Sequence, residues 1–243
     1  MNLTYAIFSD KGDREINEDS VGKANNSSGS CFILCDGLGG HGMGDVASKL
    51  VVNTFKKMFI AGNTCSDFLE AAFQNAQKLL MKKQVELKAM RKMKTTTAAV
   101  VIDDKKAYIG YIGDSRVYVF RKNKMKKRTL DHSIPQMLVF SKEIKENEIR
   151  NHPDRNILLR VMGIEWDEPM YEIMKPIALK KDRAFLLCSD GFWELIEEDR
   201  MCALLEKAES VDDWVNSMAQ TVKNNGANMN MDNYSAIAIW VNK

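Results

Sequence analysis

Six acidic residues stand where the chain enters or leaves a short apolar run, and carboxylates in such places can do chemistry together. They are Glu18, Asp19, Asp36, Asp114, Asp190 and Asp232. Most adjoin a Gly, Ser or Asn that lets the backbone turn sharply, as in Asp36-Gly37 and Asp190-Gly191. One Asp-Gly pair alone is a common turn. Because strand ends can converge on one cleft, the whole set predicts a cluster of mutually repelling carboxylates.

Such a cluster needs protons or cations to offset its charge. The chain has 3 His, and no His/Cys set has the spacing of a zinc site. Hard divalent ions prefer oxygen ligands, so the acids predict a site for more than one Mn²⁺ or Mg²⁺ ion. A water shared by two such ions loses its proton near neutral pH and can attack a phosphate ester.

Residues 36–44 form a glycine-rich loop, Asp-Gly-Leu-Gly-Gly-His-Gly-Met-Gly. Gly37, Gly39 and Gly42 match the G-x-G-x-x-G pattern of dinucleotide-binding loops. We reject that interpretation because Asp36 would repel a pyrophosphate, and because helices follow the loop where a parallel strand would be required. The glycines allow the backbone to approach closely, so the carbonyl of Gly37 could join Asp36 as a cation ligand.

The elements that must position these acids follow from the apolar periodicity. Short β-branched and aromatic runs predict strands at 3–8, 31–35, 96–102, 107–112, 117–120, 171–173, 184–188 and 234–241. Helical spacing predicts helices at 45–60, 67–93 and 211–223, with Ser66 as the N-cap of the second. Because the helices group together and successive strands are joined by short turns, this order predicts an α+β fold with antiparallel sheets.

Length and composition fit a soluble globular protein with one domain over residues 1–243, since 45% of the residues are hydrophobic and 28% are charged. The formal charge of +2 argues against nucleic acid or an anionic membrane as the main partner. No run approaches the roughly 18 apolar residues that span a bilayer. The N-terminus lacks the features of a signal peptide, so the odd count of 5 Cys predicts reduced thiols in a cytoplasmic protein.

Two clusters of basic residues stand out against this nearly neutral background. Residues 78–94 hold seven Lys or Arg against one acid, Glu86, and residues 121–128 hold six with no acid. One interpretation is a solvated helix face and a solvated hairpin tip. The other is a docking patch for an acidic or phosphorylated partner.

Eight motifs in order carry a resemblance that covers nearly the whole chain. They are Asp10-x-Gly12-x-Arg14-x-x-Asn17-Glu18-Asp19, Asp36-Gly-Leu-Gly-Gly-His41, Thr95-Thr-Thr97, Gly113-Asp-Ser-Arg-Val-Tyr118, Asp131-His-Ser133, Asn151-His-Pro153 leading to Gly163, Ser189-Asp-Gly191 and Asp232-Asn233. With these motifs the sequence resembles the metal-dependent protein phosphatases of type 2C, the PPM family, in their compact bacterial form.

The resemblance implies a four-layer α-β-β-α sandwich, in which helices flank two antiparallel sheets, and a centre of two Mn²⁺ or Mg²⁺ ions. It implies that Asp36 bridges both ions and that Asp190 and Asp232 complete the first site. It implies that the Gly37 carbonyl, with Glu18 and Asp19, binds the second ion or its waters. It also implies that Asp114 with Asp190 binds a third ion and that Arg14 binds the substrate phosphate. The catalytic residues would then be Arg14, Asp36 and Asp190.

The resemblance also implies the reaction and its partners. The expected activity is hydrolysis of phosphoserine and phosphothreonine in proteins modified by Ser/Thr kinases, by a monomeric enzyme with a flap-like segment at about 133–165. In many eukaryotic relatives a His directly after the Asp-Gly pair is the proposed acid, but this chain has Leu38 there. His41 is one substitute, and water on the third ion is the favoured proton source. Two alternatives stay open: a catalytically silent relative that binds phosphoproteins, and a phosphatase of small phosphorylated metabolites.

Overall fold

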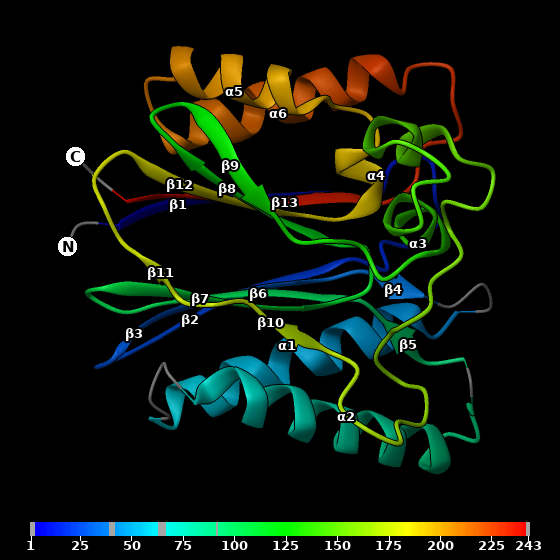
Figure 1. Ribbon diagram of the computed structural model, residues 1–243. Coiled ribbons are helices and arrows are strands. Elements are labelled where there is room, and N and C mark those ends of the chain that lie inside the picture. The colour runs from blue at the N-terminus through cyan, green and yellow to red at the C-terminus, as the bar shows by residue number, and fades with distance from the viewer. Residues whose placement is uncertain (1–2, 39–41, 63–66, 91, 242–243) are drawn as a thin grey trace.

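Two antiparallel β-sheets pack face to face between two layers of helices (Figure 1). The structure is a computed structural model that describes residues 3–38, 42–62, 67–90 and 92–241. This arrangement confirms the predicted α+β fold with four layers. Ser66, predicted as an N-cap, and His41, a candidate acid, lie outside the described residues.

The first sheet has the strand order β1-β13-β12-β8-β9, and all of its pairings are antiparallel. Its strands are β1 (Leu3–Asp10), β8 (Arg116–Arg121), β9 (Lys124–Arg128), β12 (Arg183–Cys188) and β13 (Tyr234–Val241). The second sheet has the order β10-β7-β6-β3-β2, with β11 also paired to β7. Its strands are β2 (Ser20–Asn26), β3 (Gly29–Cys35), β6 (Thr97–Ile102), β7 (Lys106–Ile112), β10 (Glu172–Ile173) and β11 (Ile177–Ala178). A small separate pair joins β4 (Gly37–Leu38) to β5 (Lys94–Thr95).

The helices are segregated, as the element order predicted. Figure 1 shows α1 (Gly44–Ile60) and α2 (Phe68–Glu86) outside the second sheet, and α5 (Glu198–Lys207) and α6 (Val211–Asn225) outside the first. The short α4 (Asp190–Trp193) follows β12 directly. Between β9 and β10 the chain forms α3 (Ile134–Phe140) and a 3-10 helix, η1 (Glu146–Asn151). No helix in the described part of the chain is long and apolar enough to cross a membrane.

The alternation of side chains along the strands builds three apolar layers. In β12, Phe185 and Leu187 pack between the sheets, whereas Leu186 and Cys188 pack toward the outer helices. All four are fully buried, so β12 reads as a continuous apolar run because both faces of its sheet are covered. A third cluster fills the space between the second sheet and the helix pair α1 and α2.

Three departures from the sequence-based elements have physical reasons. Strands β2 and β9 are edge strands with polar side chains, so they lack the apolar signal that predicts a strand. Helix α5 was not predicted. Helix α2 ends at Glu86 instead of residue 93, because Lys88 takes a left-handed φ of 50°. The chain beyond that turn is held by Gln84, whose amide donates to the carbonyls of Met93 and Gly163 at 2.7 Å each.

The packing brings one end of several strands to a single edge of the sandwich. Strands β3, β7 and β12 end there, and β2 and β13 begin there. The register shows this, because Ser20 is paired with Cys35 and Cys188 is paired with Ala236. Each of these strand ends leads directly to or from one of the predicted acids. The fold therefore delivers the acids to one place, although they lie far apart in sequence.

Candidate active site

A cleft of about 430 Å³ opens at this edge of the sandwich. Its walls include seven of the eight residues predicted for the site, namely Arg14, Glu18, Asp36, Gly37, Asp114, Asp190 and Asp232. The eighth, Asp19, lies behind the wall with only 6% of its surface exposed. The carboxylates do converge, as the sequence predicted.

The backbone of Asp36, directly after β3, is held by hydrogen bonds, so that its side chain is free to line the cleft. The Asp36 N–H donates to Thr96 Oγ1 at 3.0 Å, and the Asp36 carbonyl accepts from Thr96 N at 2.8 Å and from Thr95 Oγ1 at 2.7 Å. At Gly37 a Cβ atom would lie 2.3 Å from the Gly44 carbonyl oxygen, so only glycine allows the two loop segments to approach this closely. The threonine motif thus acts as the support of Asp36.

Asp19 is a buried carboxyl group with one satisfied oxygen. Its Oδ2 accepts from Ser189 Oγ at 2.8 Å, while Oδ1 has no hydrogen-bond partner among the described residues. Burial, and then the charges of Asp190 and Asp232, raise the pKa of Asp19 to about 7. A buried oxygen without a donor is a group that a cation, or water held by a cation, can satisfy.

Asp114 occupies a turn that is fixed from two sides. The Trp193 Nε1–H donates to the Asp114 carbonyl at 3.0 Å, and the Gly113 N–H donates to His132 Nδ1 at 3.1 Å. Asp114 is 4% exposed, and its Oδ1 also lacks a partner among the described residues. Burial and the nearby charge of Asp190 raise its pKa well above the usual value.

Asp36 and Asp190 follow the ends of β3 and β12, and both line the cleft. Burial comes first among the causes that raise the pKa of each residue. The charge of a neighbouring carboxylate comes second, Asp190 for Asp36 and Asp232 for Asp190. The raised pKa values favour protons on these carboxyl groups, and bound cations could take the place of those protons.

The opposite wall of the cleft carries an arginine–carboxylate pair. Arg14 Nε and Nη2 donate to the two oxygens of Asp232, each at 3.0 Å. In the described part of the chain, no three acidic, His or Cys side chains are arranged to hold a metal as they stand. Asp232 is engaged by Arg14, which holds both of its carboxylate oxygens.

The donor set nevertheless fits divalent cations. Two buried carboxyl oxygens lack partners, and four carboxyl groups have pKa values raised by burial and mutual repulsion. Dications with oxygen ligands would remove both problems at once, without any histidine or cysteine. The acids of the cleft are therefore suited to hard metal ions.

Several residues that support the site carried no predicted role. The Asn233 side chain accepts from Glu18 N at 2.7 Å and donates to the carbonyls of Lys11 and Ile16, which fastens the 11–18 loop to β13. Asn156 and Leu158 reach the cleft from the segment after η1. Asn233 belongs to the Asp-Asn motif, so its place beside Asp232 was the available signal, whereas the two residues after η1 had none.

Comparison with known proteins decides the family. The family profile described as protein phosphatase 2C matches residues 10–234, which is most of the chain. The chain belongs to the protein phosphatase 2C family. It is thus a hydrolase, a protein phosphatase of the 2C type.

This 2C-type phosphatase is similar to bacterial serine/threonine phosphatases. The serine/threonine phosphatase stp of Listeria welshimeri is 29% identical over 205 residues, which is 82% of this chain and 81% of that protein. The crystal structure of the serine/threonine phosphatase Stp1 from Staphylococcus aureus has a TM-score of 0.91 and 29% identity, with 100% of this chain and 96% of that chain covered. The catalytic domain of the phosphatase PstP, solved in complex with 2 manganese ions, has a TM-score of 0.81 and 25% identity, with 99% of each chain covered.

The 2C-type phosphatase has no acid at the position after Asp36-Gly37. Leu38 lines the cleft there, and it pairs in β4 with Lys94 of β5. The imidazole of His132 is committed elsewhere, since it is stacked on Tyr111 and its Nε2 lies 3.2 Å from Glu172 Oε1. His132 thus orders the turn that carries Asp114, since its Nδ1 accepts from the Gly113 N–H.

Proposed function

We propose that this phosphatase hydrolyses phosphoserine and phosphothreonine esters in proteins, with Mn²⁺ or Mg²⁺ bound in the acidic cleft. The observation that carries the proposal is the convergence of Arg14 with five carboxylates on one cleft, backed by Asp19. A phosphate dianion could not approach such a set of acids unless cations offset their charge. The names of the relatives support the choice of serine and threonine, and the manganese bound by PstP supports the metal.

Each predicted residue has a place in this proposal. Asp36 would contact both ions of a pair. Asp190 and Asp232 would bind the first ion, and the Gly37 carbonyl with Glu18 and Asp19 would bind the second ion or its waters. Asp114 with Asp190 would bind a third ion. When bound, the ions would supply positive charge to the phosphoryl oxygens and acidify bound water, both the water that attacks and a water that could protonate the departing alkoxide.

The side chains of the chain itself orient the substrate. Arg14 stands half-exposed at the mouth of the cleft, where its guanidinium can present two donors to a phosphate in place of Asp232. Thr95 and Thr96 keep Asp36 in place, so the acid does not have to reorganise when the substrate arrives. Asn156 and Leu158 would meet the polypeptide on either side of the phosphorylated residue.

The organisation of the molecule follows from the same proposal. The whole chain, 1–243, would act as one catalytic domain, and residues 133–165 would form the flap beside the cleft. This segment is tied to the body by ion pairs, since Arg155 binds Glu194 at 3.1 Å and Arg150 binds Glu198 at 2.7 Å. Partners would be proteins phosphorylated by Ser/Thr kinases. The monomeric state, the cytoplasmic location and the lack of nucleic acid or membrane partners stay predictions.

Purified protein tests the proposal directly. With Mn²⁺ it should hydrolyse p-nitrophenyl phosphate and a phosphothreonine peptide, and both EDTA and Asp190→Ala should reduce the rate to background. Asp212→Asn, an exposed acid at the start of α6, is the matched control and should leave the rate unchanged. Full activity in EDTA would refute the proposal. Mn²⁺ binding without turnover would indicate a silent relative, and a higher kcat/KM for sugar phosphates would indicate a metabolite phosphatase.

A further inference from the structure

A second hollow lies outside the catalytic cleft, between α1 and α2 on the outer face of the helix layer. Its volume is about 520 Å³. It is lined by Leu50, Asn53, Thr54, Lys57, Met58, Asn75, Leu79, Lys82, Lys83 and Glu86. We call this hollow the α1–α2 groove.

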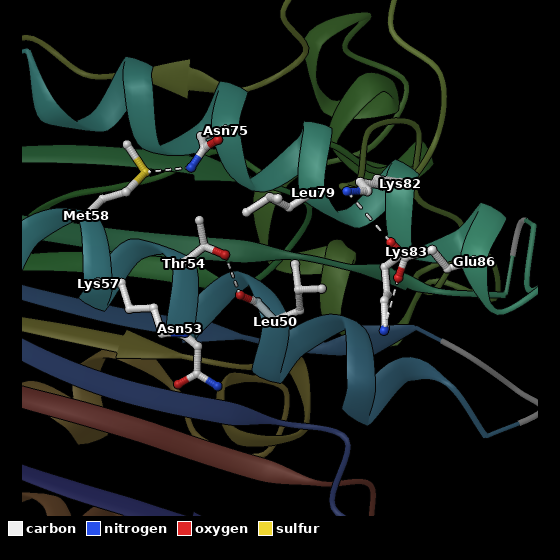
Figure 2. A pocket seen from close by; sticks show the side chains of 10 residues that line it. All are labelled: Leu50, Asn53, Thr54, Lys57, Met58, Asn75, Leu79, Lys82, Lys83 and Glu86. Atoms are coloured by element: carbon white, nitrogen blue, oxygen red, sulfur yellow. Dashed lines mark hydrogen bonds and ion pairs between the residues drawn. The ribbon is translucent and has the colours of Figure 1, made fainter.

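Helical spacing explains why these side chains share one groove. The lining residues of α1, from Leu50 to Met58, and those of α2, from Asn75 to Glu86, recur at intervals of three, four or one along each helix. Each set therefore forms one stripe, and the two stripes face each other across the groove. Figure 2 shows Leu50 and Leu79 pointing into the gap from opposite helices. The groove thus has apolar walls along its middle.

One end of the groove is closed and the other is charged. Asn75 Nδ2 lies 3.2 Å from Met58 Sδ and bridges the helices at one end (Figure 2). At the other end, Glu86 lies 3.9 Å from Lys82 and 3.2 Å from Lys83. Of the described residues that line the groove, Glu86 is the one acid, against three lysines. A net positive charge therefore remains beside the apolar walls.

One apolar side chain of the groove, Leu79, is left uncovered although both helices are well packed beneath. Leu79 is 40% exposed, whereas Leu50 is partly buried and also packs against the core. The opposite face of the same helices is buried on the second sheet, where Phe55 and Phe73 contact edge to face at 5.2 Å. The core therefore does not account for the apolar side chain of Leu79, whereas binding of an apolar ligand does.

We propose that the α1–α2 groove binds an acidic amphipathic segment of a partner protein, by apolar side chains seated between Leu50 and Leu79 and carboxylates near Lys57, Lys82 and Lys83. The charge complementarity selects the acidic segment, and the trough between two helices suits a helix or an extended chain better than a flat surface. This docking site does not depend on the metal centre.

The test is direct binding of a probe peptide. The probe is a fluorescein-labelled amphipathic peptide with leucines at helical spacing and flanking glutamates, and its counterpart carries lysines in place of the glutamates. Fluorescence polarisation should show that the wild-type protein binds the acidic probe, equally well with Mn²⁺ and with EDTA, and that added salt weakens the complex. Lys57→Glu with Lys83→Glu, and separately Leu79→Glu, should weaken binding at least about tenfold.

Matched variants keep the proposal falsifiable. Lys126→Glu with Lys127→Glu on β9 makes the same change of charge elsewhere, and Val85→Glu places a new acid on an exposed position of α2 that does not line the groove. Both should retain binding. Equal losses in these controls, equal binding of the lysine-flanked peptide, or no binding of the acidic probe would overturn the proposal. Light scattering gives a further test. If the wild-type protein is a dimer and Lys57→Glu with Lys83→Glu dissociates it, the occupant of the groove is a second copy of the chain and the proposal is wrong. Hydrolysis of p-nitrophenyl phosphate should be the same in all variants, which separates failure of the docking site from failure of the catalytic one.

Discussion

Arg14 and Asp232, 218 positions apart in the chain, form a two-point ion pair at the mouth of the cleft, with both contacts at 3.0 Å. The planar guanidinium matches the two carboxylate oxygens, as it would match two oxygens of a phosphate. The two oxygens of Asp232 cannot both accept hydrogen bonds from Arg14 and at the same time coordinate a cation fully. The pair therefore links the binding of metal at Asp232 to the freedom of Arg14 to bind phosphate.

Removal of the guanidinium should separate these two roles. Arg14→Ala should lower kcat/KM for a phosphopeptide by roughly 100-fold, because one charged donor to the phosphate is lost. The same change should tighten Mn²⁺ binding by up to about fivefold, since an exposed competitor for Asp232 is gone. Steady-state kinetics and titration calorimetry measure the two effects. Weaker Mn²⁺ binding in Arg14→Ala would show that the pair does not compete with the metal.

Asp190→Asn should abolish hydrolysis and yet stabilise the metal-free protein. Asp190 lies among carboxylates that raise its pKa, and Asn would keep the acceptor that receives the Gly191 N–H at 2.6 Å. Relief of about 1 kcal/mol of repulsion corresponds to a rise in Tm of about 2–4 °C for a protein of this size. Thermal melts in EDTA test this, with Asp212→Asn as the control. A lower Tm in EDTA would show that Asp190 stabilises the cleft instead of straining it.

The stability of the metal-free protein should fall as pH rises through the acidic range. The pKa of Asp19 is raised to about 7 in the folded protein, against about 3.9 in an unfolded chain. Below the lower value both states hold the proton. Between the two values only the folded state holds it, so the free energy of unfolding falls by about 1.4 kcal/mol per pH unit from this group, and it levels off above about pH 7.

Urea unfolding in EDTA at several pH values measures this slope. Asp19→Asn, which keeps an acceptor for Ser189 Oγ, should lose the contribution of Asp19. The difference between the two proteins isolates that residue from the other titrating groups. Identical slopes in wild type and variant would mean that Asp19 is ionised in the folded state across this range.

The buried pair of Arg116 and Asp131 should be essential for stability. Arg116 Nε and Nη2 donate to the two oxygens of Asp131 at 2.8 and 2.6 Å, and the two side chains are 3% and 1% exposed. Arg116→Met would remove the two-point partner of this buried carboxylate and leave it with Arg128 at 3.3 Å, at a cost of about 3 kcal/mol. Lys126→Met, on the exposed face of β9, should change the free energy of unfolding by less than about 0.5 kcal/mol. Equal urea midpoints for the two variants would contradict this.

Arg116 also supports the site at a distance. Its guanidinium carbon lies 3.4 Å from the ring centre of Trp193, whose indole N–H holds the Asp114 carbonyl. The motif Gly113-Asp-Ser-Arg-Val-Tyr118 therefore contains both an acid of the cleft and part of its support. Residues that are close in sequence here serve different layers of the structure, because β8 runs from the cleft into the core.

Much of the site could be predicted from the sequence because its signals are local. An apolar run that ends in Asp-Gly marks both a strand and its exit, and this pattern located Asp36 and Asp190 without any knowledge of their neighbours. The strands of the core were found for the same reason. Edge strands β2 and β9 and helix α5 were missed, because their side chains do not have the continuous apolar pattern of elements buried on both faces.

The chain's own order of residue types determined that it would fold as layered antiparallel sheets and that acids would stand at the strand ends. Only tertiary packing decided which of those acids meet other groups of the site, because contacts such as Arg14 with Asp232 and Ser189 with Asp19 join segments 218 and 170 positions apart. Packing also decided that Asp232 turns toward Arg14 and that Asp19 is sealed behind the cleft. These outcomes depend on the electrostatic field and the burial that all the layers create together, and no local pattern carries that information.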